Sequence, residues 1–540
     1  MKTLKSILFP ACYALWPVFL LWLNNIDVVR SASVVRSLVV VGAAALVVSL
    51  VLIPIIRQPA RRTLALCLFW LFFFSYGLFL WDHRDVNTTL PSQFFFFDYY
   101  FLFVYVFTLC CLLVATLGTR RVDLVTHASN IVGSTGVFLL VLTLGQIGFH
   151  QVRSAGDDGY APAQTVVAAK PREAVARLPD IYYIVLDGHG RADVLQEFYG
   201  YDSSQFIREL EALGFYVARE STSNYPYTYL SIPSALNLGY VNEAAPDLRS
   251  YIRDRRPLMN MMGYSQAYQF LKQYEYTFVT FGSGWSADSN LPTADLHYES
   301  PTLLNEFENM LLGNSLMIPF GYRRIQYYLH REGVRYFFDH LADVASIPQP
   351  TLTYAHIMVP HPPFVFGSDG EPILPNLPFV FDDVTWRAML GKTSEAYVNG
   401  YRGQVTYVDQ VLIQVLRQIL ASSPQPPVII IQGDHGPASV FANDHLTVDG
   451  VRERFSILNA YYLPNGTTTL ELYPTITPVN SFRAIFNTYF GTQLDFLEDK
   501  SYIPVTVDSE IGYEMLDVTP YLTPGKEASG TLPIMPSSRR

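Results

Sequence analysis

Five long apolar stretches in the first 150 residues constrain the fold of this chain most strongly. A helix needs about 20 mostly apolar residues to cross a bilayer. Lys2 and Lys5 precede the first stretch, which would suit a signal peptide, but no small-residue cleavage site stands out. We therefore predict a five-helix transmembrane region over residues 1–150. The predicted spans are residues 6–25, 34–56, 63–81, 96–118 and 128–149.

Basic residues at alternate ends of these spans predict the orientation of the chain. Loops that carry an excess of Lys and Arg stay in the cytoplasm. Arg30 and Arg36, near the start of the second span, weaken the pattern slightly. With a cytoplasmic N-terminus and five spans, the rest of the chain is expected outside, on the periplasmic or extracellular side of the plasma membrane. The basic residues at the expected cytoplasmic ends are Lys2, Lys5, Arg57, Arg61, Arg62, Arg120 and Arg121.

The remaining residues, 151–540, are acidic. They carry 27 Lys and Arg against 42 Asp and Glu, a formal charge of −15. Such a charge repels a phosphate backbone, so nucleic acid is not expected as a partner. The four cysteines, Cys12, Cys67, Cys110 and Cys111, all lie in the apolar stretches. The polar part of the chain therefore has no disulfide framework and no thiol chemistry.

The pattern after Pro179 predicts an α/β domain. Residues 151–178 are rich in Ala, Gly and charge without a period, and we interpret them as a linker. From 179 to 540, short continuous apolar runs alternate with amphipathic segments, which indicates a mainly parallel sheet covered on both faces. The expected strands are Ile181–Leu186, Tyr276–Phe281, Leu352–Met358 and Val428–Ile431. The expected helices lie near 203–213, 257–273, 323–345 and 395–420.

Two of the expected strands end in candidate metal ligands. In folds of this kind, sites form outside the carboxyl ends of the strands. Asp187 ends the first strand, where a carboxylate is costly unless it is paired, caps a helix or binds a metal. Asp434 and His435 follow the Val428 strand and offer an oxygen and a nitrogen, a common pair for zinc or manganese. An ordinary turn or a helix cap would explain each motif equally well in isolation.

Two other segments contain candidate catalytic residues. Thr228, in the segment that begins at Asn224, would lie at the start of a helix, where the dipole favours an alkoxide, although it could be a plain N-cap. His356 and His361 follow the third strand and could neutralise or protonate a bound oxyanion, although such histidines are often structural. His445 is a similar, weaker candidate.

In chain order, these motifs resemble the alkaline phosphatase superfamily, and within it the lipoteichoic acid synthases and lipid A phosphoethanolamine transferases. Those families also have five N-terminal spans and an outer sulfatase-like catalytic domain. The resemblance implies that Asp187, Asp434 and His435 bind the metal together with the oxygen of Thr228, which would be the nucleophile. It also implies that His356 and His361 act on the substrate. His445 and Asn224 are then expected to help bind the substrate.

The sequence also departs from these families. The transferases usually carry Glu near the position of Asp187, and their outer disulfides are missing here. Sulfatases share the fold, and Ser231-Ile-Pro233-Ser234 is similar to their signature. However, Ala235 stands in place of its arginine, and no cysteine is available in the domain to become formylglycine. A modified Ser231 stays open as an alternative.

The sequence therefore favours a metal-dependent enzyme with zinc or manganese as its cofactor. The first hypothesis is a transferase that moves a phospho-headgroup from a phospholipid donor to an envelope lipid or glycan, through a covalent threonine intermediate. The second is a sulfatase-like hydrolase of phosphate or sulfate esters. The third is a silent envelope protein that keeps only the fold, although the presence of every candidate ligand argues against it. The sequence does not indicate an oligomeric state.

Overall fold

The computed structural model describes residues 2–82, 91–154, 178–244, 255–301, 304–464 and 472–522, with short breaks at 286, 289–290, 376, 391–393, 443–444 and 508–509. The side chains of residues 78–101 and most of the predicted linker lie outside this description. The chain forms two compact units. The first contains Met1–Gly159 and Leu304–Gln326, and the second contains Tyr160–Leu303 and Tyr327–Arg540.

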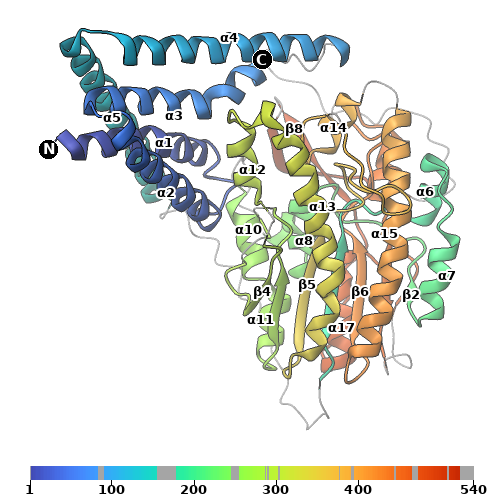
Figure 1. Ribbon diagram of the computed structural model, residues 1–540. Coiled ribbons are helices and arrows are strands. Elements are labelled where there is room, and N and C mark those ends of the chain that lie inside the picture. The colour runs from blue at the N-terminus through green and yellow to red at the C-terminus, as the bar shows by residue number, and fades with distance from the viewer. Residues whose placement is uncertain are drawn as a thin grey trace. The chain divides into compact units, whose positions relative to one another are not determined.

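Helices make up the first unit, which we call the membrane unit (Figure 1). Among the described residues, three helical segments are long and apolar enough to cross a membrane: Leu4–Asn24, Ser31–Ile55 and Val122–Arg153. Three of the five predicted spans are thereby confirmed by length and composition. The other two are helical, and their crossing stays a prediction. The helices of this unit are α1 (Lys2–Asn24), α2 (Ser31–Ile55), α3 (Pro59–Asp82), α4 (Pro91–Gly118), α5 (Val122–Ser154), α12 (Glu306–Gly313) and the 3₁₀ turn η1 (Ile318–Phe320).

Hydrogen bonds join the helix ends that the sequence assigns to the cytoplasm. The Arg62 guanidinium donates to Ser6 Oγ, 2.8 Å away, near the start of α1. Arg61 donates to the Thr119 carbonyl, 2.7 Å away, just after α4. The N-terminus, the α2–α3 loop and the α4–α5 loop therefore meet on one side of the unit, as a chain that crosses back and forth requires.

The second unit, which we call the outer domain, is built on a seven-stranded sheet in the order β2-β7-β6-β1-β5-β3-β4. The four pairs from β6 to β4 are parallel, whereas β7 and β2 add an antiparallel edge, so the sheet is mixed but mainly parallel. The strands are β1 (Ile181–Leu186), β2 (Tyr216–Val217), β3 (Thr277–Phe281), β4 (Leu296–Tyr298), β5 (Thr351–Ile357), β6 (Val428–Gly433) and β7 (Asn459–Tyr462). A separate hairpin pairs β8 (Tyr502–Val507) with β9 (Glu510–Asp517).

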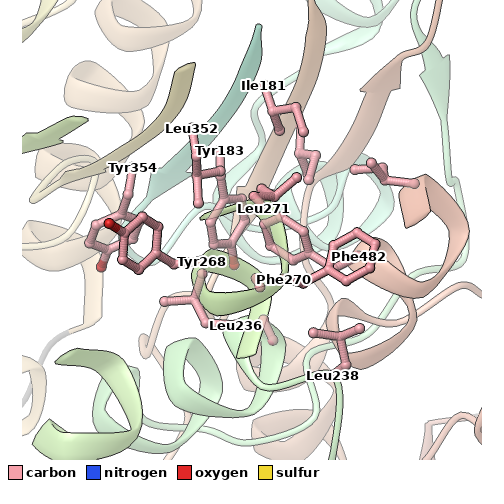
Figure 2. Close-up of a cluster of buried hydrophobic side chains, with 14 of the residues drawn as sticks. Ile181, Tyr183, Leu236, Leu238, Tyr268, Phe270, Leu271, Leu352, Tyr354 and Phe482 are labelled. Atoms are coloured by element: carbon pink, nitrogen blue, oxygen red, sulfur yellow. The ribbon is translucent and has the colours of Figure 1, made fainter. Parts of the chain in front are cut away.

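Helices cover both faces of the sheet because successive strand residues point to opposite sides. Ile181 and Tyr183 of β1 join one core with α8, α10, α11 and α17, which Figure 2 shows in close-up. Tyr182 and Ile184 join the other core with α7, α13, α14 and α15, and α13 and α15 run along that face in Figure 1. The helices are α6 (Ala192–Tyr199), α7 (Ser204–Ala212), α8 (Thr228–Leu236), α9 (Val241–Ala244), α10 (Arg256–Gly263), α11 (Gln266–Lys272), α13 (Tyr322–His340), η2 (Leu341–Ser346), α14 (Asp383–Met389), α15 (Ser394–Ser422), α16 (Val448–Phe455), α17 (Pro478–Phe490) and η3 (Thr519–Tyr521).

The predicted elements match the observed ones to within a residue or two at most ends, with two divisions. The helix expected near 323–345 is α13 followed by the 3₁₀ helix η2. The helix expected near 257–273 is two helices, α10 and α11. The side chain of Ser265 accepts a hydrogen bond from the Tyr268 N–H and so caps a new helix start inside the amphipathic pattern. The short strands β2, β4 and β7 were not predicted, since strands of two to four residues carry little pattern.

Candidate metal centre and active site

Parallel pairing brings two of the predicted ligands to the same level of the sheet. In the β1–β6 register, Leu186 lies opposite Gly433, so the residues that follow them, Asp187 and Asp434, leave the sheet side by side. The Gly188 N–H donates to Asp434 Oδ1 at 3.0 Å and locks the two strand ends together. The side chains of Asp187 and Asp434 are both buried.

Four candidate ligand atoms converge at this edge. His435 Nε2 lies 3.3 Å from Thr228 Oγ1, 3.4 Å from Asp434 Oδ2 and 3.6 Å from Asp187 Oδ1. Ligands about 2.0–2.1 Å from a tetrahedral ion are separated by ~3.3 Å, so these spacings match a four-coordinate site. The structure thus brings together the four residues that the sequence proposed as ligands.

The hydrogen bonding of these atoms also fits a cation. Asp187 Oδ1 and Asp434 Oδ2 are buried and have no hydrogen-bond partner among the residues that the structure describes. Burying a carboxylate oxygen without a partner costs folding free energy. A bound cation would give both oxygens a partner and so remove this cost. His435 Nδ1 faces the Gly436 carbonyl at 3.0 Å and so carries the hydrogen, which leaves the Nε2 lone pair directed at the cluster. This donor set fits zinc or manganese.

Thr228 is the first residue of α8, and its position depends on the core beneath that helix. Leu236 of α8 packs with Phe270, Leu271 and Phe482 against the sheet (Figure 2). The side chain of Thr228 is only partly buried, so a substrate can reach it. The positive end of the α8 dipole lies at this hydroxyl and favours its deprotonated form.

His356 lies between two carboxylates. Its Nδ1 is 2.7 Å from Asp288 Oδ2, and its Nε2 is 3.3 Å from Asp187 Oδ2. Burial would lower the pKa of His356, but the two carboxylates outweigh burial and raise the pKa to about 10. This geometry suits a histidine that holds Asp187 in place through its second oxygen. The catalytic role predicted for His356 stays a prediction.

His361 is part of a second charged group beside the cluster. Its Nε2 donates to Asp383 Oδ2 at 3.1 Å, and its ring centroid lies 6.1 Å from that of His435. Burial would lower the pKa of His361, but Asp187 and Asp383 raise it to about 9. This shift favours the protonated imidazole beside the candidate ligands. The predicted contact of His361 with an oxyanion stays a prediction.

Arg454 of α16 completes this group. Its Nη1 donates to Asp383 Oδ2 at 2.6 Å, and its Nη2 lies 3.2 Å from His435 Nε2. The guanidinium also donates to the Pro226 carbonyl, 2.8 Å away, just before Thr228. Arg454 thus links the segment of the nucleophile to the loop of the ligands.

Arg454, Asp383 and Asp288 were not predicted from the sequence as site residues. None of them follows an expected strand or stands in a recognisable motif, so the strand-end rule could not find them. Asp383, at the start of a short helix after Asp382, had the appearance of a helix cap, and Asp382 does cap that helix.

The structure gives three other predicted residues different surroundings. The amide of Asn224 donates to the Lys500 carbonyl at 2.9 Å and accepts from the Val479 N–H at 3.0 Å, so it holds the loop that leads to Thr228. His445 is exposed, and no hydrogen bond joins it to the cluster among the described residues. The expected substrate contacts of both residues stay predictions. The Ser231 hydroxyl is buried and donates to the Tyr225 carbonyl at 2.8 Å.

Comparisons with known proteins give neighbours of the kind that the motifs resemble. No family model and no curated protein matches the chain. Among solved structures, it is similar to the C-terminal periplasmic domain of EcEptC from Escherichia coli in complex with Zn, at 15% identity and a TM-score of 0.39 over 64% of this chain and 95% of that chain. It is also similar to the integral membrane protein lipooligosaccharide phosphoethanolamine transferase A from Neisseria meningitidis, at 12% identity and a TM-score of 0.38 over 90% and 95%. A third neighbour, assigned as a sulfatase from Bacteroides thetaiotaomicron, has 15% identity and a TM-score of 0.37 over 60% and 77%. With every score below 0.5, the function has to be argued from the site itself.

Proposed function

We propose that this protein is a metal-dependent transferase that moves a phospho-headgroup from a membrane phospholipid to an envelope acceptor through a phosphothreonine at Thr228. The observation that carries the proposal is the convergence of the Thr228 hydroxyl, the His435 imidazole and two unpartnered carboxylate oxygens. A nucleophile at a helix start, within ligand distance of a metal site, is the arrangement that phosphoryl transfer to a protein hydroxyl needs.

Asp187, Asp434, His435 and Thr228 would hold the ion, which would lower the pKa of the hydroxyl and polarise the phosphoester. Thr228 Oγ1, releasing its proton to water, would form a bond to phosphorus while the bond to the leaving oxygen breaks. His361 is placed to give that oxygen its proton, and Arg454 to bind the equatorial oxygens. An acceptor hydroxyl then gives its proton to His361 and displaces Thr228 from phosphorus, and the freed Thr228 oxygen takes a proton back from water.

The formal charge of the site supports a substrate with one negative charge. Asp187, Asp434, Asp383 and Asp288 contribute four carboxylates, and His356, His361 and Arg454 contribute three cations. While the Thr228 hydroxyl keeps its proton, a divalent ion brings the total to one net positive charge. A phosphodiester carries one negative charge and balances it, whereas a phosphate monoester dianion does not. A sulfate monoester would balance it too, but the buried Ser231 hydroxyl gives no support to a formylglycine there.

The membrane unit supports a lipid as the donor. One helix would be enough to tether a domain, whereas this chain has at least three segments able to cross a membrane. A donor confined to the bilayer does not depend on long-range steering, which the acidic outer domain would oppose for a free anion. The basic loops 57–62 and 119–121 lie together, next to the start of α5, whereas the chain continues to the outer domain from the other end of α5. Because basic loops stay in the cytoplasm, we place the outer domain on the extracytoplasmic side.

The test is to incubate purified full-length enzyme with headgroup-labelled phospholipids and to measure diacylglycerol release. Mass spectrometry should find the headgroup on a peptide that contains Thr228, and the Thr228→Ala variant should show neither product. Rapid cleavage of soluble sulfate or phosphate esters without any consumption of phospholipid would overturn the transferase proposal in favour of a hydrolase.

A further inference from the structure

Residues Leu304–Gln326, which we call the insert, come from the middle of the outer-domain sequence but pack with the helices of the membrane unit. This packing was not predicted, because the segment lies well inside the stretch expected to form the α/β domain. The insert contains α12, η1 and the first turn of α13.

Specific bonds dock the insert on α2. Asn305 caps α12 in a capping box with Glu308, and its amide donates to the Ser33 carbonyl at 3.0 Å. The Glu308 carboxylate is largely buried and accepts from Nε and Nη2 of the Arg36 guanidinium. Arg36 weakened the pattern of basic residues that predicts the orientation of the chain. Its positive charge is offset by Glu308 in this ion pair.

The insert also bonds to the backbone of α3. Gly77 N–H donates to the Asn314 carbonyl at 2.9 Å, and Leu316 N–H donates to the Phe73 carbonyl at 2.7 Å. A Cβ at Gly77 would lie 2.5 Å from Asn314 Cα, so only glycine permits this approach. Leu316 and Ile318 then pack on Tyr76 and Tyr105.

If α3 crosses the membrane as predicted, these contacts set the depth of the insert in the bilayer. Arg36 lies five residues from the start of α2, and Gly77 lies five residues from the end of α3. At 1.5 Å per residue, the docking points are about 8 Å inside the helix ends. That depth corresponds to the boundary between headgroups and acyl chains, where amphipathic segments bind.

The free side of the insert has the composition of a membrane-surface element. Phe320 is 70% exposed and Ile325 is 43% exposed, and Met317 is half-buried beside them. Arg324 follows within one helical turn and is exposed. An apolar tip next to a cation, at interfacial depth, matches a bilayer with anionic headgroups.

We propose that residues 316–325 bind the membrane surface, with Phe320 among the acyl chains and Arg324 on the phosphate of an anionic phospholipid. The hydrogen bonds and the ion pair to α2 and α3 hold residues 316–325 at the membrane surface. These contacts do not depend on the reaction that the outer domain performs. The proposal is therefore independent of the proposed transfer chemistry.

The test uses full-length protein in vesicles, with the four native cysteines replaced and a fluorophore on a single cysteine at position 320. We expect quenching by spin-labelled lipids and protection from aqueous iodide. Quenching by iodide but not by lipid would overturn the proposal.

A second measurement addresses the headgroup. Spin-labelled phosphatidylglycerol should quench about fivefold more effectively than spin-labelled phosphatidylcholine, the enrichment expected for one cation at the surface. The preference should disappear in Arg324→Gln and persist in Arg208→Gln, which removes the same charge from an exposed position on α7. Equal quenching by the two lipids in the unsubstituted protein would refute the role of Arg324.

Discussion

Asp434→Asn should change the stability of the protein in opposite directions depending on whether metal is present. Asp434 Oδ1 accepts the Gly188 N–H, and an asparagine oxygen can keep that bond. Asp434 Oδ2 is buried and has no hydrogen-bond partner among the described residues, so an amide group in its place breaks no bond seen there. The substitution therefore removes a ligand charge while it preserves the shape of the loop.

The magnitudes follow from the geometry and from linkage. The ligand atoms of Asp187 and Asp434 lie within 4.8 Å of each other. Two unit charges at that separation repel by about 3.5 kcal/mol at an effective dielectric constant of ~20. Metal at 1,000 times its dissociation constant stabilises the folded state by about 4 kcal/mol. With chelator, we expect Asp434→Asn to be more stable than the wild type by up to ~3 kcal/mol. With excess zinc, only the wild type should gain stability.

The assay is unfolding of detergent-solubilised protein by heat or denaturant, with zinc or with chelator, alongside elemental analysis of bound metal. The control is Asp409→Asn, because Asp409 is equally buried but is fully bonded to His189 at 2.8 Å and Tyr201 at 2.7 Å. That variant should lose stability by about 1–3 kcal/mol in both conditions. A loss in Asp434→Asn that matches the control with and without metal would refute the metal centre.

Four further predictions test other parts of the structure. Thr228→Ala should abolish turnover and leave the bound metal in place, since three ligands remain, whereas Thr228→Ser should retain measurable activity and a modified Ser peptide. Arg454→Lys should raise KM or lower kcat by at least about tenfold, because a point charge cannot reproduce the forked contacts of the guanidinium. Steady-state kinetics at fixed metal occupancy would check this, and unchanged kinetics would contradict the proposed contact with substrate. Gly77→Ala should cost about 1–3 kcal/mol by overpacking against Asn314 and should expose the insert to protease. Reporter fusions after residue 160 and within 57–62 should report opposite sides of the membrane. If both fusions reported the same side, the predicted orientation would be wrong.

The sequence alone was enough to predict the elements that depend on local pattern. Ile181–Leu186 was predicted at its observed bounds because a run of six apolar residues next to a turn has few other structures open to it. Asp187, Asp434 and His435 could be selected because parallel strands deliver the residues that follow them to one edge, and Thr228 because a helix start is readable from sequence.

Tertiary structure alone decided what surrounds those residues. Asp383, Arg454 and Asp288 reach the site from a short helix, a second helix and a turn, and their places depend on how distant segments pack. His356 lies between two carboxylates, and Asn224 holds a loop through its hydrogen bonds. A buried polar group needs a partner, and the packing of distant segments decides which partner is near it. The docking of Leu304–Gln326 on the membrane helices depends on a single glycine, on one partly buried ion pair and on backbone bonds between segments more than 200 residues apart. Local sequence patterns cannot predict such contacts, because they form only when segments far apart in the sequence pack together in the folded chain.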